Sequence, residues 1–258
     1  MERTKVLKMA YEKRFDGRDL GELRQMEAKV GIIPRADGSA YFRIGKTIAY
    51  AAVYGPRDLY PRFLQNPERG ILRCSYNMMP FSGYGERVRP GGNRRSKEIS
   101  LVTEKALLPV LDLSEYPNAV VDVFIEFPQT NAGSRCAGIT AAAMALADAG
   151  IPMNDLVAAV SVGRVDDKLV VDIDYKEEAY EDGPVADIPV AVTSRTQKIT
   201  LLQMDGEISK DDLAKCLELA KNALKKVDEV QRKALREKFA REKEMEIVEG
   251  TEGVDQNE

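Results

Sequence analysis

Runs of β-branched and aromatic residues, broken by Gly and Pro, mark most of the strands that this sequence predicts. Residues 38–55 are rich in Tyr, Phe, Ile and Val and are split by Gly45-Lys46-Thr47, which predicts a β-hairpin. Residues 72–80 and 119–128 predict two further strands, and the second of these runs consists mainly of Val, Ile and Phe. Four more strands are expected in the second half of the chain, at residues 158–165, 168–174, 188–193 and 198–203.

Two helices are expected between these strands. The first begins at about Ser96, where apolar residues start to recur at near-helical spacing, and ends near Pro109. The second opens at Ser134-Arg135, continues through the alanine-rich residues 136–149 and is closed by Gly150. The many small side chains of this second helix indicate close packing against a sheet.

The last predicted element is a long helix. The segment from Ser209 to Asp212 resembles a capping box, and apolar residues then recur at intervals of 4, 3, 4 and 3. A helix that ended at Glu244 would be about 54 Å long. The apolar stripe weakens after Val230, so we expect the second half to project, to dock on a partner or to fray. The acidic residues 245–258 are expected to form a disordered tail.

Strand runs that alternate with helices indicate an α/β (α+β) domain. Strands come in pairs before each helix, which favours a mixed sheet over a purely parallel one. We therefore expect an N-terminal arm at residues 1–14, a single domain at residues 15–244 that includes the long helix, and the acidic tail at residues 245–258.

The chain contains no histidine, which narrows the chemistry that it can perform. Without histidine there is no Ser-His-Asp triad and no imidazole metal ligand, so acid-base groups must come from other side chains, a metal or the substrate. The 3 cysteines are far apart, which favours a reducing cytoplasm over a disulfide framework. No apolar run approaches the ~20 residues of a membrane span, and the charged N-terminus does not resemble a signal peptide.

Charge is distributed unevenly along the chain, although the net charge is only −4. Residues 57–97 carry nine Lys and Arg against three Asp and Glu, whereas residues 166–187 carry nine Asp and Glu against two Lys. A basic and an acidic segment in one domain can build a site that binds a polyanion together with a cation.

Three short segments resemble familiar sites without matching them. Gly45-Lys46-Thr47 looks like the end of a phosphate loop, but Ala40 stands where that motif requires Gly. Gly83-Tyr84-Gly85 lacks the third Gly of a dinucleotide-binding fingerprint. Cys136 lies at a helix start, where a thiol can be acidified, but nothing in the sequence assists it, and buried packing is the better interpretation.

The segment Gly133-Ser134-Arg135 is the first candidate for binding chemistry. It lies between a predicted strand and a predicted helix, where free backbone amides and the helix dipole favour an anion. Ser134 adds a hydroxyl donor and Arg135 a two-pronged guanidinium. The alternative is a capping serine beside a surface arginine.

Arg94 and Arg95 are the second candidate. They follow Pro-Gly-Gly just before a predicted helix, which suits contacts with phosphate or an RNA backbone. Arg87 and Arg89 extend the same basic loop. The alternative is a solvated loop that binds nothing.

The acidic residues 172–189 are the third candidate. Alternation along the predicted strand would place Asp172 and Asp174 on one face, and Asp187 begins the next strand. Carboxylates at both ends of the intervening loop suit Mg²⁺, which takes a few carboxylates together with water and substrate phosphate. An exposed acidic hairpin is the alternative. Together with the arginines, a metal ion held by these carboxylates would form a phosphoryl-transfer site that needs no histidine.

Five short motifs occur in order between residues 12 and 240. They are Phe15-Asp16-Gly17-Arg18, residues 66–74, residues 94–100, Gly133-Ser134-Arg135 and Ala186-Asp187-Ile188-Pro189. In this order they resemble the RNase PH family and, within it, the catalytic RNase PH-like subunits of archaeal exosomes. The resemblance implies the RNase PH fold and 3′→5′ phosphorolysis of RNA, in which inorganic phosphate releases a nucleoside diphosphate and the reverse reaction adds tails.

The resemblance also implies roles for particular residues. Ser134 and Arg135 match the family's phosphate-binding pair, while Arg94 and Arg95 match arginines that hold the phosphate and the RNA 3′ end. Asp187 matches a catalytic aspartate that binds the metal, Mg²⁺ or Mn²⁺, or assists the leaving 3′-oxygen.

A second catalytic aspartate is expected six residues before Asp187, but this chain has Glu181 there, in a loop that is longer than usual. Asp182, Glu181 and Glu178 all fit the role. We choose Asp182 as the second catalytic carboxylate and metal ligand.

An assembly is implied as well. The subunit would alternate with an inactive RNase PH-like paralogue in a hexameric ring of three heterodimers, capped by S1- or KH-type proteins. Single-stranded RNA would thread the central channel, where Arg62 lies near a constriction, and Arg89 would help to bind it.

Two other interpretations remain open. The altered acidic loop motivates a non-catalytic ring subunit that binds RNA, and an unrelated metal-dependent phosphotransferase could have a similar layout.

Overall fold

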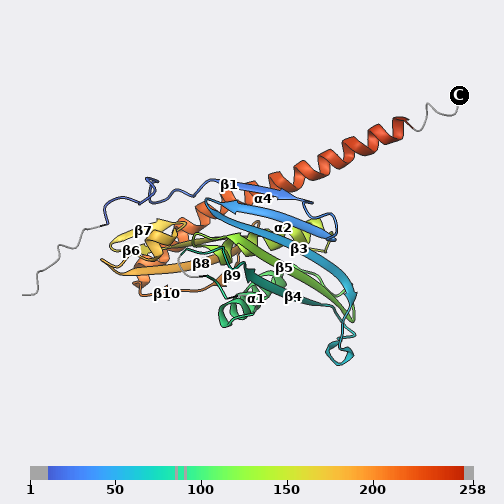
Figure 1. Cartoon of the computed structure of the whole chain (residues 1–258), viewed down its shortest axis with the longest axis horizontal. Coiled ribbons are helices and arrows are strands. Elements are labelled where there is room, and N and C mark those ends of the chain that lie inside the picture. Colours follow the sequence, from blue (N-terminus) through green and yellow to red (C-terminus); the bar gives the residue numbers. More distant parts are fainter. Residues whose placement is uncertain (1–10, 85–86, 90–91, 253–258) are drawn as a thin grey trace, which may run out of the picture.

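Two five-stranded sheets form the body of the protein. The computed structural model describes residues 11–84, 87–89 and 92–252, with side chains up to residue 240. The strand order is β1-β2-β3-β5-β4 in the first sheet and β10-β8-β6-β7 in the second, where β9 also pairs with β8 (Figure 1). The strands of the first sheet are β1 (Met26–Val30), β2 (Gly38–Ile44), β3 (Thr47–Asp58), β4 (Ile71–Met78) and β5 (Ala119–Gln129). Those of the second sheet are β6 (Val157–Val165), β7 (Lys168–Val171), β8 (Val185–Thr193), β9 (Ile199–Leu202) and β10 (Asp205–Gly206).

The strand pairing confirms the mixed sheet and most of the strand predictions. β4 and β5 are parallel, whereas the other strand pairs of the first sheet are antiparallel. β2 and β3 form the predicted hairpin and turn at Gly45-Lys46, where Gly45 adopts a positive φ of 57°. Sequence reasoning missed β1, a short strand whose burial is only partial.

Helices pack on and between the two sheets. They are α1 (Arg94–Leu107), α2 (Ser134–Asp148), α3 (Tyr175–Glu178) and α4 (Lys210–Glu252), with two 3-10 turns, η1 (Arg62–Leu64) and η2 (Leu108–Val110). α2 contacts strands of both sheets and is buried along most of its length, and one hydrophobic core extends across both sheets. Its small residues permit this close packing: a Cβ atom added to Gly138 would lie 3.2 Å from the ring of Phe127.

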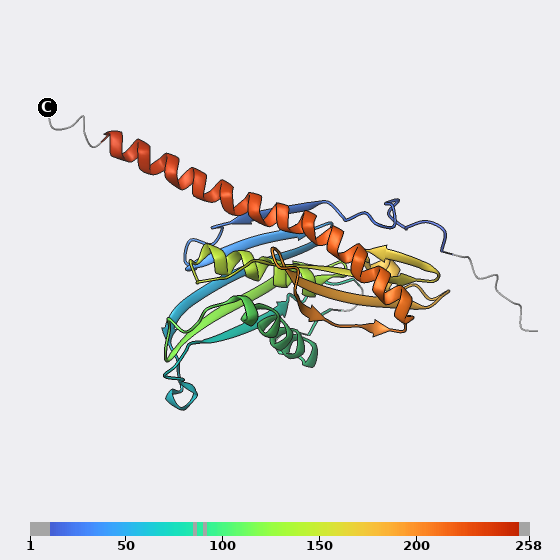
Figure 2. The ribbon, with the colours of Figure 1, turned by 180° about the vertical axis from the view of Figure 1, so that it is seen from behind.

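α4 is longer than the sequence indicates. It spans 43 residues, or about 64 Å. Of the predicted apolar positions, Ala220, Leu224 and Val227 are buried, while Leu213 and Leu217 are partly buried against the core. The C-terminal part of the helix projects beyond both sheets (Figure 2). Helix therefore continues through residues 245–252, where we expected the disordered tail to begin, and residues 253–258 lie outside the described part of the chain.

Two predictions about local structure are wrong. The strand expected at residues 168–174 ends at Val171, because Asp172 turns into the left-handed region at a φ of 57° and directs its carboxylate toward Arg24. Asp174 is the N-cap of α3, so Asp172 and Asp174 do not share a strand face. Arg94 and Arg95 form the first turn of α1 rather than the loop before it, because Asn93 caps this helix.

Predictions about the N-terminus and the cysteines have mixed outcomes. Of the expected arm, residues 1–10 lie outside the described range, whereas Tyr11 and Arg14 are buried, so the packed domain begins earlier than residue 15.

Cys136 is buried, which raises the pKa of its thiol and confirms the packing interpretation. No helix in the described part of the chain has the length and apolar character needed to cross a membrane.

Candidate active site

A small polar cavity of about 60 Å³ lies between the start of α2 and the β8–β10 edge of the second sheet. It is lined by Arg95, Gly133, Ser134, Arg135, Cys136, Glu178, Asp187, Pro189 and Asp205. The arginines and the serine come from α1 and α2, whereas the carboxylates come from α3, β8 and β10. The three sequence candidates therefore meet in one place, with cationic groups on one side and carboxylates on the other.

The start of α2 provides the anion-binding side of the cavity. Gly133 precedes the helix with a φ of 65°, and no side chain caps the first turn. The leading amides of a helix have no intrahelical acceptor, and the helix dipole adds partial positive charge there. The Tyr76 hydroxyl donates to Ser134 Oγ at 2.7 Å, so the Ser134 proton remains available to a bound anion.

Arg135 is oriented by two polar side chains that the sequence did not indicate. Its Nη1 donates to Gln203 Oε1 at 2.7 Å and lies 3.8 Å from Glu98 Oε1. Gln203 Nε2 donates to Glu98 at 3.1 Å, which closes a small network between α1 and the segment after β9. These contacts restrict the guanidinium, so less conformational entropy is lost when it binds an anion.

Asp187, Glu178 and Asp205 form the acidic side of the cavity, and the sequence did not indicate Asp205. Partial burial raises the pKa of Asp187, although the Ser161 hydroxyl donates a short hydrogen bond to its Oδ1 and Arg135 lies nearby. Partial desolvation and the charge of Asp187 raise the pKa of Glu178 as well. Carboxylates that repel one another in this way are suited to share a cation.

This donor set fits a magnesium-type site but not a closed metal cage. Within the described ranges, no three His, Cys, Asp or Glu side chains come together as a ready-made metal-binding group. Mg²⁺ usually keeps several waters and is held by one or two carboxylates plus substrate phosphate, so two carboxylates beside an anion site satisfy its requirements.

The remaining candidate residues do not line this cavity. Arg94 is the exposed first residue of α1, and Arg89 is exposed in the loop before it. Arg62 lies in η1, on the loop between β3 and β4, which extends away from the second sheet (Figure 1). Asp182 and Glu181 are exposed in the turn before β8. Of the three carboxylates that the sequence left open, Glu178 is the one that lines the cavity.

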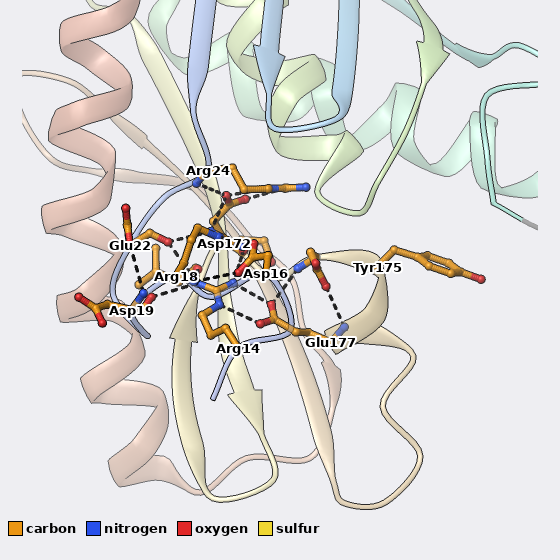
Figure 3. A network of polar contacts seen from close by, with 12 residues as sticks. Arg14, Asp16, Arg18, Asp19, Glu22, Arg24, Asp172, Tyr175 and Glu177 are labelled. Carbon is orange, nitrogen blue, oxygen red and sulfur yellow. Dashed lines mark hydrogen bonds and ion pairs between the residues drawn. The ribbon is translucent and has the colours of Figure 1, made fainter. Parts of the chain in front are cut away.

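The position of Glu178 is set by a buried ion pair next to it. Arg14 Nε and Nη2 donate to the two carboxylate oxygens of Glu177 at 2.8 and 2.7 Å, and both side chains are fully buried (Figure 3). The Tyr11 hydroxyl donates to Glu177 at 2.6 Å. Burial opposes ionisation, but these hydrogen bonds hold the pKa of Glu177 below its usual value. The N-terminal segment thus fixes α3 and, with it, the backbone of Glu178.

A second arginine connects the two sides of the cavity. Arg24 Nη2 and Nε donate to Asp172 at 2.6 and 2.8 Å, just before α3, while its Nη1 donates to the carbonyl of Asn131, just before α2. Arg18 also pairs with Asp172, at 3.2 Å. Asp172, which the sequence suggested as a metal ligand, is therefore a partner of two arginines.

Comparisons with known proteins identify the family of this chain. Residues 22–152 match the family model described as 3′ exoribonuclease family, domain 1 (RNase PH), and residues 155–223 match domain 2 of the same family. A protein from Thermococcus kodakarensis named Exosome complex component Rrp41 is 50% identical over 98% of this chain and 100% of its own length. A protein of the same name from Methanopyrus kandleri is 48% identical over 88% of this chain and 93% of its own.

Similarity extends to a solved structure. The crystal structure of rice Rrp46 has a TM-score of 0.74 and 25% identity, and the match covers 86% of this chain and 100% of the rice chain. The chain therefore belongs to the RNase PH family of 3′ exoribonucleases. The boundary between the two family domains falls between α2 and β6, so the cavity takes its arginines from the first domain and its carboxylates from the second.

Proposed function

We propose that this chain is a catalytic subunit of an archaeal-type exosome ring that degrades RNA from the 3′ end with inorganic phosphate. The observation that supports this most directly is the meeting of Arg95, Ser134 and Arg135 with Glu178 and Asp187 in one cavity. Names of the archaeal relatives support the assembly, since those proteins are exosome components.

Phosphate would bind at the start of α2. The helix amides, the Ser134 hydroxyl and the guanidinium groups of Arg95 and Arg135 would hold it and reduce its repulsion from the RNA phosphodiester. One phosphate oxygen attacks the terminal phosphodiester, and the bond from that phosphorus to the preceding 3′-oxygen breaks. A nucleoside diphosphate leaves, and the proton that the 3′-oxygen needs is available on the attacking hydrogen phosphate. This reaction requires no histidine.

The carboxylate side would hold the cation. In this proposal Glu178 and Asp187 bind Mg²⁺ or Mn²⁺, and Glu178 takes the role that the sequence analysis gave to Asp182. A bound divalent ion supplies positive charge where the leaving 3′-oxygen becomes negative. Arg94, with Arg89 and Arg62 further out, would contact the RNA backbone outside the cavity.

The partners follow from the family and stay proposals. We infer an inactive RNase PH-like paralogue alternating with this subunit in a six-membered ring, S1- or KH-type cap proteins, single-stranded RNA as substrate, and a cytoplasmic location. Membership of the family removes the basis for an unrelated phosphotransferase.

The activity test is direct. The full chain, alone and mixed with its paralogue, is incubated with Mg²⁺, phosphate and poly(A), and ADP release is measured. We expect ADP only when phosphate is present. Release of AMP, or no product in any mixture, would refute the proposed reaction.

A non-catalytic RNA-binding subunit is the second candidate function, and the altered acidic loop favours it, because Glu181 stands where the family resemblance led us to expect an aspartate and the carboxylate that lines the cavity is Glu178. Asp187→Asn separates the two functions. Loss of turnover in this variant with retained RNA binding supports catalysis, whereas unchanged turnover of the assembled ring places the chemistry in another subunit.

A further inference from the structure

A second and larger cavity lies beside the active site, with a volume of about 670 Å³. We call it the aromatic cavity. Its lining includes Phe15, Lys46, Tyr84, Asn131, Tyr175 and Lys176. These residues come from the N-terminal segment, the turn between β2 and β3, the segment after β4, the turn before α2, and α3.

Aromatic rings with accessible faces dominate one part of this cavity. The rings of Tyr84 and Tyr175 stack at a centroid distance of 5.2 Å and an interplanar angle of 18°. Tyr84 is 49% exposed, Tyr175 42% and Phe15 48%. Figure 3 shows the Tyr175 side chain pointing away from the ion pairs around Arg14 and Arg24. Phe15 packs one side of its ring against Tyr11 and Tyr180, whereas Tyr84 and Tyr175 pair with each other. Flat aromatic surfaces of this kind are what unpaired nucleic-acid bases stack on.

The charge of the aromatic cavity favours an anionic ligand. Arg18 and Arg24 are neutralised by Asp16 and Asp172, while Asp174, which also lines the cavity, accepts a hydrogen bond from the backbone of α3. Lys46 and Lys176 are exposed, and within the described residues neither has a carboxylate at ion-pair distance. Two lysines beside stacked rings supply the point charges that a nucleic-acid backbone requires.

The two cavities share their walls. Tyr175 and Lys176 lie in the aromatic cavity and Glu178, at the end of the same short helix, lies in the active-site cavity. Asn131 lines the first and Gly133 the second, on the same turn. Three residues span at most about 11 Å between Cα atoms, so a strand with its 3′ end in the active site has a neighbouring nucleotide within reach of the tyrosines.

We propose that the aromatic cavity binds one nucleotide of single-stranded RNA, with its base on the exposed tyrosine face and its phosphate at Lys46 and Lys176. The proposal rests on the proposed function, since it assigns a subsite to the same substrate. RNA fits the cavity better than a free nucleoside diphosphate does. A diphosphate would need an arginine to bind it with two hydrogen bonds, and both arginines that line the cavity are already paired with aspartates. An RNA strand whose 3′ end is bound in the active site has a high local concentration at the aromatic cavity, so weak contacts with two lysines are enough to hold its next nucleotide.

The test uses the full chain with its paralogue and RNAs that carry 2-aminopurine at successive positions from the 3′ end. Stacking quenches this base, so we expect one position to be quenched in the wild type and released in Tyr175→Ala. The Kd for RNA should rise about 5- to 100-fold in Tyr175→Ala and stay within about twofold in Tyr175→Phe, which keeps the ring. The Kd for inorganic phosphate should not change in Tyr175→Ala, which separates loss of the subsite from collapse of α3.

A charge variant and a matched control complete the design. Lys46→Ala/Lys176→Ala should lower the slope of log affinity against log salt by about 1.4. Phe239→Ala removes an equally exposed ring on α4, far from both cavities in sequence, and should change nothing.

Two outcomes would overturn the proposal: equal RNA affinity in Tyr175→Ala and wild type, or no position-specific quenching. If the wild type itself releases no ADP from RNA, the proposed function fails instead.

Discussion

Arg14→Met probes the buried ion pair that holds α3 in place. The substitution removes two charged hydrogen bonds to Glu177 and leaves a fully buried carboxylate with the Tyr11 hydroxyl and one backbone amide as its remaining donors. Breaking one partner of a buried pair costs about 3–5 kcal/mol. Arg14 also donates to the carbonyls of Val171 and Asp172 at 2.7 and 2.8 Å, so we expect the free energy of unfolding to fall by about 4 kcal/mol.

The measurement is urea unfolding followed by circular dichroism, for the wild type, Arg14→Met and Arg14→Met/Glu177→Gln. The double variant removes the stranded charge but keeps donors and acceptors for Tyr11 and Asp174, so it should recover at least half of the lost stability. A penalty below about 1 kcal/mol at pH 7, or a double variant no more stable than the single one, would refute the reasoning.

The same pair predicts a dependence on pH. Because Arg14 holds the pKa of Glu177 down, the stability that the pair contributes is present above the unfolded-state pKa of about 4.3 and is lost as the pH falls below it. The difference in unfolding free energy between wild type and Arg14→Met should therefore shrink as the pH falls from about 5 to about 3. A difference that grows on acidification would contradict the assigned direction of the pKa shift.

Five substitutions test the active site and the turn that supports it. Asp187→Asn should lower turnover by roughly 100- to 1000-fold with little change in the KM for RNA, measured as ADP release. Glu178→Gln should lose activity to a similar degree while Asp182→Asn stays near wild type, and the reverse pattern would restore the assignment made from the sequence. Arg135→Lys should raise the KM for phosphate about tenfold, because an ammonium cannot hold Gln203 and phosphate at once in the geometry of the guanidinium. Gly133→Ala should destabilise the protein by about 1–2 kcal/mol in thermal unfolding, because Gly133 has a φ of 65°.

Features encoded in short windows of the sequence were predicted well. The β-branched run that forms β5 and the alanine-rich α2 depend on local composition, and Ser134 and Arg135 were placed at the helix start because the strand and the helix around them were recognised. Family resemblance then supplied the reaction, which spacing alone does not specify.

The positions of the carboxylates were harder to predict, because partners far away in the sequence determine how these side chains are oriented. Alternation at Val170 to Asp174 imitates a strand, but Asp172 pairs with Arg24, 148 residues away. One local signal was overlooked: Asp174 and Glu177 have the spacing of a capping box, which indicates that a helix begins at Tyr175 and that the strand has already ended.

The ion pair between Arg14 and Glu177 joins positions 163 residues apart, and this separation orders events during synthesis. Arg14 leaves the ribosome early, and at about 5–20 residues per second its partner follows some 8–30 s later. Until then the arginine has no buried carboxylate to meet, and the segment that carries Glu178 does not exist. The carboxylate side of the active site is therefore completed only after most of the chain has been made, so nascent chains that stop before residue 177 should have no nuclease activity.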